Sequence, residues 1–215
     1  MLKNLFIVEL FVKGGPVMVP LLLCSIIAVA VVLERIRFHA NYRRNPDDFV
    51  THVKAALINR DYLEALKLCR KESHPLARVI AKAIDHLDFG KEDLLDIMRQ
   101  EALRQVKMFQ KNLGMLSTIA TISPLLGLTG TITGMITSFS VISSIGIGDP
   151  TALAGGISEA LYTTAAGLFV GIPSLVAYNW CESRTTEFTD QVEYYSLDLV
   201  NHSSVREGVR EKAAA

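Results

Sequence analysis

This chain of 215 residues lacks an excess of either charge and contains little cysteine. Its 22 Lys and Arg balance 22 Asp and Glu, so no basic footprint points to nucleic acid as a partner. Three cysteines are too few and too scattered for a disulfide framework or a CxxC metal site, and we expect them to pack as small hydrophobic groups. They are Cys24, Cys69 and Cys181.

Motifs of soluble enzymes are also missing. The segment Gly127–Gly134 is rich in glycine but lacks the Gly-Lys-Ser/Thr ending of a phosphate-binding loop. All five histidines fall outside the apolar runs, which leaves no intramembrane Ser–His dyad or metal site, and we expect them to be solvated surface groups. They are His39, His52, His74, His86 and His202. We therefore expect no enzyme activity, no metal and no cofactor.

Charge is nearly absent from three long stretches, where the hydrophobic residues gather. Half of the chain is hydrophobic, and the mean hydropathy is +0.30. Residues 14–33 carry no charge, and about 20 apolar residues suffice for a helix to span a bilayer. The uncharged run 112–148 is too long for one untilted span, so it also contains part of a loop. The third run, 156–180, contains one charged residue, Glu159.

These runs predict an all-α membrane protein with three transmembrane helices. We place the spans at residues 16–36, 113–141 and 156–180. Between and beyond them we expect an amphipathic segment, a polar helical domain, a short loop, and a helix with a tail. These are residues 1–15, 37–112, 142–155 and 181–215. From Lys91 the helical pattern continues into the second apolar run without a recognised breaker, so we expect one uninterrupted helix there.

Basic residues flank the predicted spans on one side of the membrane. They are Arg35, Arg37, Arg43, Arg44, Arg104, Lys107, Lys111 and Arg184. The loop 143–155 contains neither Lys nor Arg. The positive-inside rule therefore predicts that 37–112 and the C-terminal segment are cytoplasmic, while the N-terminus and the short loop are periplasmic.

Glu159 sets a physical problem that the rest of the protein has to solve. An acid at the bilayer centre costs roughly 2.5 kcal/mol or more. A partner helix, an ion or a water-filled path has to offset that cost. We expect the side chain to face a hydrated lumen near the periplasmic end of the third span.

Small and polar residues form a stripe along the second and third spans. On the second span the stripe contains Gly127, Thr131, Gly134 and Ser138, and on the third Glu159, Thr163, Gly167, Gly171 and Ser174. Helices with such stripes can approach closely and form hydrogen bonds with each other. We interpret the following glycines as packing residues: Gly127, Gly130, Gly134, Gly167 and Gly171.

Together these motifs resemble the MotA/TolQ/ExbB proton-channel family, and within it the three-span ExbB and TolQ proteins. The resemblance covers nearly the whole chain in architecture and is strongest from Ser123 to Asn179. It rests on Pro124-Leu-Leu-Gly-Leu-Thr-Gly-Thr-Ile-Thr-Gly134, Gly156-Ile-Ser-Glu-Ala-Leu161 and Thr164-Ala-Ala-Gly167. Thr129 and Thr163 depart from residues common at these places in the family.

The resemblance implies a homopentameric ring in the bacterial inner membrane, with the second and third spans lining its centre. Inside would sit the single helices of two ExbD- or TolR-like one-span partner chains, which carry the protonatable aspartate. Proton flow would move these partner chains and energise a TonB- or TolA-like protein for outer-membrane transport. Thr131 and Thr164 would be pore-facing hydroxyls, and Glu159 a charged member of the lining. A TolQ-like role in envelope integrity and a passive membrane scaffold stay open as alternatives, and three spans argue against a flagellar-type stator.

The predicted topology can be tested with reporters. A reporter fused after Asn41 or after Ser183 is expected to read cytoplasmic, and one inserted at Gly148 periplasmic, because Lys and Arg resist transfer across the membrane. Alkaline phosphatase is active only in the periplasm and the fluorescent protein only in the cytoplasm, so a pair of fusions at each site gives two independent readouts. A cytoplasmic Gly148 reporter contradicts the three-span topology.

Overall fold

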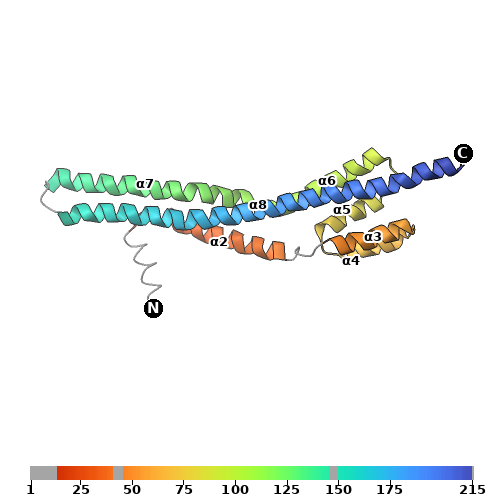
Figure 1. Ribbon diagram of the computed structural model, residues 1–215. Coiled ribbons are helices and arrows are strands. Elements are labelled where there is room, and N and C mark those ends of the chain that lie inside the picture. The colour runs from red at the N-terminus through yellow and green to blue at the C-terminus, as the bar shows by residue number, and fades with distance from the viewer. Residues whose placement is uncertain (1–13, 41–45, 146–149, 215) are drawn as a thin grey trace. The chain divides into compact units, whose positions relative to one another are not determined.

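The computed structural model describes residues 14–40, 46–145 and 150–214, without the side chains at 145, 150–153 and beyond 200 (Figure 1). The predicted amphipathic segment therefore lies almost wholly outside the described residues. Within these ranges the regular structure is entirely helical, which confirms the all-α prediction. The described chain divides into two compact units.

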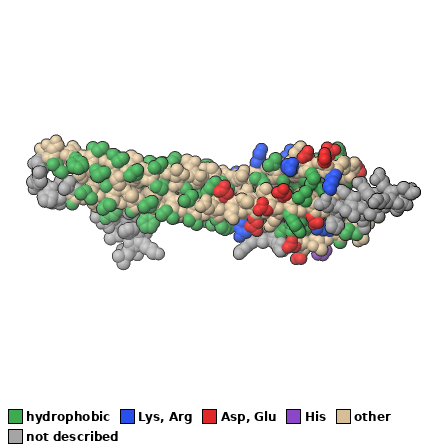
Figure 2. Space-filling model, turned by 45° about the horizontal axis from the view of Figure 1, so that its top comes forward, with side chains coloured by type: hydrophobic (Ala, Val, Ile, Leu, Met, Phe, Trp, Pro, Cys, Tyr) green, Lys and Arg blue, Asp and Glu red, His purple; other side chains and the backbone are tan. Residues whose placement is uncertain are grey.

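We call these the apolar unit and the polar unit. The apolar unit holds the described residues up to Arg35 together with Asn112–Trp180. The polar unit holds Ile36–Lys111 together with the described residues from Cys181 on. On the face drawn in Figure 2, charged side chains gather over the polar unit, while the apolar unit shows hydrophobic side chains scattered among other uncharged groups.

Three helices build the apolar unit: α2 (Met18–Ala40), α7 (Leu113–Ile145) and α8 (Pro150–Ala214). Each contains a stretch long and apolar enough to cross a membrane. Both α7 and α8 extend into the predicted loop 142–155, whose centre, 146–149, lies outside the described residues. α8 continues past the predicted third span without interruption.

Hydrophobic clusters fix the direction of α2 within the apolar unit. Early in α2, Met18 packs in one cluster with Ala166 of α8 and Leu126 of α7. Later in α2, Val31 belongs to a cluster with Leu116 of α7 and, partly buried, Ala177 of α8. α2 therefore runs parallel to α8 and antiparallel to α7, as three successive passes require.

The prediction of one uninterrupted helix from Lys91 into the second span is wrong. α6 ends at Phe109 and α7 begins at Leu113. Between them Asn112 has φ 62, a left-handed conformation that ends a helix and that Asn adopts more readily than most residues. The Asn112 amide donates a 2.7 Å hydrogen bond to the Glu34 carboxylate, which holds the break in place.

The polar unit contains four shorter helices and the second part of α8. They are α3 (Asp47–Ile58), α4 (Tyr62–Lys71), α5 (Pro75–Ile84) and α6 (Lys91–Phe109). Local signals set two of the starts. The Asp61 carboxylate caps α4 by accepting the N–H of Glu64 at 2.9 Å. His74 caps α5, and Pro75 follows at the first helical position, where its missing N–H costs nothing.

α5 lies at the centre of the polar unit. Most of its residues are buried, and Leu76 and Ile80 are fully enclosed. α8 closes the core with Phe188, whose ring stacks on Phe109 of α6 with centroids 4.7 Å apart. Burial of apolar surface is the main term that stabilises such a bundle.

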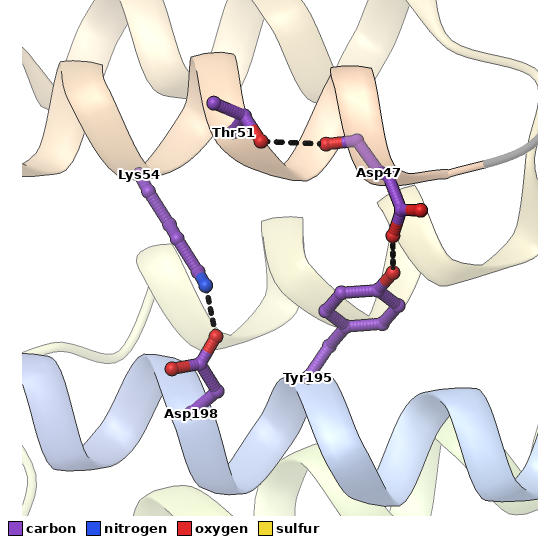
Figure 3. Close-up of polar contacts among 5 residues, drawn as sticks. All are labelled: Asp47, Thr51, Lys54, Tyr195 and Asp198. Carbon is purple, nitrogen blue, oxygen red and sulfur yellow. Dashed lines mark hydrogen bonds and ion pairs between the residues drawn. The ribbon is translucent and has the colours of Figure 1, made fainter.

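Polar contacts connect α3 to the second part of α8 (Figure 3). Lys54 forms an ion pair with Asp198, and the Tyr195 hydroxyl bonds the Asp47 carboxylate. The Lys54 and Asp198 side chains are each about one quarter exposed, so water screens this pair less than an open surface pair. Residues more than 140 positions apart in the sequence thus hold α8 against α3.

The expectation that all histidines are solvated is wrong for two of them. His39 and His74 are buried, each with 8% exposure. The His39 ring lies 5.5 Å from the Phe109 ring, and the His74 ring lies 6.3 Å from that of Phe188. Nδ1 of His74 accepts the N–H of Leu76 at 3.2 Å. Burial lowers the pKa of His74 from its usual value of 6.5, and the nearby charge of Glu72 opposes this more weakly.

The buried His74 predicts that the polar unit is less stable in acid. The pKa of His74 is below 6.5 in the folded state and about 6.5 in the unfolded state. As the pH falls below 6.5, the unfolded chain therefore binds more protons than the folded one, and stability decreases until the pH passes the folded-state pKa. His74→Asn keeps an acceptor for the helix cap and removes the titration, so it should flatten this part of the pH dependence. Thermal unfolding of the purified protein at pH of about 7.5 and about 5.5 measures the effect. His52→Asn, at an exposed ring, serves as the control. An equal loss of stability between the two pH values in the wild type, His74→Asn and His52→Asn would refute the prediction.

Candidate proton-pathway site

The first part of α8 lies side by side with α7 (Figure 1), and glycines face each other at their contact. A β-carbon on Gly167 would lie 2.6 Å from the Ser123 carbonyl oxygen, and one on Gly134 would lie 2.6 Å from that of Gly156. Real β-carbons do not approach an oxygen so closely, so the two backbones touch directly.

The remaining glycines predicted to pack also lie at this contact. A β-carbon on Gly127 would be 3.0 Å from the Thr163 carbonyl oxygen, and one on Gly171 would be 2.8 Å from the Pro124 ring. Thr163, a residue of the predicted stripe but not one of the predicted site residues, fills the space beside Gly130. Its side chain has no solvent exposure, and its hydroxyl donates to the Ala160 carbonyl at 2.9 Å.

The two threonines predicted to face the pore both bond backbone carbonyls. The Thr131 hydroxyl donates to the Leu128 carbonyl of its own helix at 2.7 Å. The Thr164 hydroxyl lies 3.1 Å from the Ala160 carbonyl and 3.3 Å from the Gly127 carbonyl of α7. Both side chains are half-buried. Since a hydroxyl has one hydrogen and two lone pairs, each oxygen can still accept a hydrogen bond from water or a partner.

Helix geometry places both threonines on the same edge of the α7–α8 contact, away from α2. Leu126 packs with α2, and Thr131 follows it by five residues, about 140° around the helix. On α8, Ala166 packs with α2 and lies almost in line with Glu159, seven residues earlier. Thr164 follows Glu159 by five residues and is again turned by about 140°. The structure therefore brings Thr131 and Thr164 to one edge and leaves Glu159 on the other.

Glu159 lies against the turn that leads into α2. Gly15 in this turn has φ +66, and its backbone closely approaches the Glu159 side chain. A β-carbon at Gly15 would lie 2.7 Å from the carboxyl carbon of Glu159 and still closer to one of the carboxylate oxygens. Gly15 is not among the site residues predicted from the sequence, although a local signal was present. The signal was Gly14-Gly15-Pro16, which marks a turn immediately before the first apolar helix.

The close contact predicts a cost for adding a methyl group at Gly130. In Gly130→Ala the new carbon would lie 2.4 Å from the Thr163 β-carbon, so the helices must separate, at a cost of about 1–3 kcal/mol. Thermal unfolding in detergent measures this loss. Gly114→Ala, on the same helix but with open space around it, is the control and should match the wild type. Equal stability of the two variants contradicts the close contact at Gly130.

Comparison with known proteins places this architecture in a family. The model of the MotA/TolQ/ExbB proton channel family matches residues 71–194. A protein of Synechocystis named as biopolymer transport protein ExbB-like 1 is 32% identical over 190 residues, covering 86% of this chain and 73% of that protein. Biopolymer transport protein exbB1 of Vibrio cholerae is 30% identical and covers 84% and 82%. The Tol-Pal system protein TolQ of Pseudomonas aeruginosa is 35% identical over 94 residues, 44% of this chain and 41% of that protein.

The family match spans more than half of the chain and includes both glycine-lined helices with Thr131, Glu159 and Thr164. It agrees with three helices able to cross a membrane and with the names of the relatives, which describe transport of biopolymers. The chain belongs to the MotA/TolQ/ExbB proton channel family.

Proposed function

We propose that this protein is an ExbB-like motor subunit of the bacterial inner membrane, driven by the proton-motive force. Several copies, five by the resemblance, form a ring in which α7 and α8 line a path for protons. The ring encloses the helix of an ExbD- or TolR-like one-span partner. Movement of that partner energises a TonB-like protein for transport across the outer membrane.

The placement of Thr131 and Thr164 carries the proposal. Both half-buried hydroxyls lie on the edge of the α7–α8 contact that faces away from α2. Each donates its hydrogen to a carbonyl and keeps lone pairs for a water or for a protonated carboxyl of the partner. This edge is the surface that α7 and α8 can turn toward a lumen while α2 faces lipid. Many of the large side chains of α2 are exposed and apolar, as a lipid-facing helix requires; they include Val19, Leu23, Ile26 and Val29.

The membrane potential can bias such a step. Each proton that crosses about 100 mV releases about 2.3 kcal/mol. We assign the polar unit to the cytoplasm and the segment between α7 and α8 to the periplasm, following the distribution of basic residues. The work is then delivered on the periplasmic side, where a TonB-like protein can receive it.

A TolQ-like role in envelope integrity is the second candidate, and the similarity to TolQ of Pseudomonas aeruginosa favours it. The two functions use the same proton step and differ in the protein that receives the work. Co-purification from the native membrane separates them, because the one-span partner and the attached periplasm-spanning protein can be identified by mass spectrometry.

The proposal predicts that the two hydroxyls are needed for coupling but not for assembly. Thr131→Val and Thr164→Val keep the shape of the side chain and remove a donor and an acceptor. We expect insertion and oligomer formation at wild-type levels and a fall of proton-driven activity by about fivefold or more, since a lost buried hydrogen bond costs roughly 1–3 kcal/mol. Proton flux into vesicles that contain this protein and its partner measures the loss.

Two matched variants control this experiment. Thr131→Ser and Thr164→Ser keep the hydroxyl and should retain most of the flux. Thr129→Val removes an exposed hydroxyl that bonds the Leu125 carbonyl of the same helix at 2.9 Å, and it should behave as wild type. Full flux in both pore variants would exclude Thr131 and Thr164 from the proton path.

A further inference from the structure

Glu159 and the turn before α2 are brought together by the fold, although more than 140 residues separate them. The carboxylate occupies the place where any side chain at residue 15 would begin. Gly15 also has φ +66, a backbone conformation that glycine adopts without strain. The backbone conformation thus favours glycine at residue 15, and a side chain there would displace the flexible end of Glu159.

The chemistry of this turn suits a carboxylate. Gly15 accepts the N–H of Met18, the first residue of α2, so it lies at the N-terminal end of that helix. The aligned peptide dipoles place a partial positive charge there, which favours an anion. The carboxylate comes from a different helix, α8, on which Glu159 lies almost in line with Ala166, a residue that packs in one cluster with Met18 of α2. A charged group in a membrane needs such a compensation.

We propose that the turn at Gly15 seats the Glu159 carboxylate, and that Gly15 is therefore a positioning residue for Glu159, the acid on the edge of the α7–α8 contact opposite Thr131 and Thr164. The entrance of the first span then sets where Glu159 points, although α2 contributes no residue to the proposed proton path. The effect of Gly15 on activity rests on the proposed function, but the contact between the Gly15 turn and Glu159 can be tested independently of that function.

The first experiment tests the geometry alone. In the full-length protein in native membranes, Gly15→Cys combined with Glu159→Cys should form a disulfide under mild oxidation. After trypsin has cut between the two residues, the fragments should stay joined until a reductant is added. Each single variant and the pair Gly114→Cys with Glu159→Cys, which places one thiol at the opposite end of the apolar unit, should show no joined fragments. A missing bond, or one that joins two copies of the chain, would overturn the seat.

The second experiment tests the role. Gly15→Asn tolerates the left-handed backbone but keeps a β-carbon that collides with the carboxylate. We expect a several-fold loss of proton-driven flux with normal insertion. Gly155→Ala, one turn before Glu159 on α8 with nothing within 4 Å of the new carbon, should keep full flux. Wild-type flux in Gly15→Asn would refute the positioning role.

A double-mutant cycle separates positioning from general damage. Glu159→Asp withdraws the carboxylate by one methylene, so Gly15→Asn should cost clearly less when combined with Glu159→Asp than in the wild type. Equal losses in both backgrounds would mean that the two residues act independently, and would overturn the proposal. If the wild-type vesicles show no proton-driven flux at all, the proposed function fails while the disulfide still decides whether the seat exists.

Discussion

Direct contact between the backbones of α7 and α8 is the constraint on which the apolar unit depends. Water is absent from a bilayer core, so the hydrophobic effect does not drive helices together there. Charged pairs are also unfavourable there, because charges are costly to bury in a membrane. Close packing replaces them, and it requires glycine wherever a β-carbon would meet a carbonyl oxygen, as at Gly134 and Gly167. The same approach brings the Thr164 hydroxyl within reach of the Gly127 carbonyl.

This contact also sorts the polar groups of the two helices. Thr163 is enclosed at the centre and serves packing, while Thr131 and Thr164 lie at the edge away from α2. Glu159 lies at the edge toward α2, where the turn at Gly15 receives it. One pair of helices thereby presents hydroxyls on one side and a carboxylate on the other. In the proposed ring, such pairs would place the two kinds of group in different surroundings.

The polar unit uses a different source of stability. Water surrounds it in the proposed cytoplasmic location, so apolar burial around α5 and the stacked rings of Phe109 and Phe188 can drive its folding. Polar groups enter its core where they complete the backbone, as His74 does at the start of α5. α8 takes part in both units, so one helix obeys two sets of rules along its length. The small residues of α8 lie before Trp180. After Trp180 come Phe188, which stacks on Phe109, and Asp198, which pairs with Lys54.

The sequence by itself determined the all-α class, the three membrane-length helices and the family. These features depend on the order of neighbouring residues, because hydropathy and helical spacing act within a few turns. It also contained the local signals for the turn at Gly15 and the break at Asn112. Glycine and asparagine permit a left-handed backbone without requiring it, and the break was therefore missed.

Only the tertiary structure decided which residues meet. The burial of His39 and His74 depends on rings contributed by α6 and α8. Spacing within α8 already separates Glu159 from Thr164 by about 140°. Which of the two faces α2 depends on where α2 packs, and no pattern within α8 specifies that. Contacts between residues more than 140 positions apart, such as Gly15 with Glu159, follow from the packing of whole helices. Side-chain periodicity gives each helix its faces, but the choice of partner for each face is made when the helices assemble.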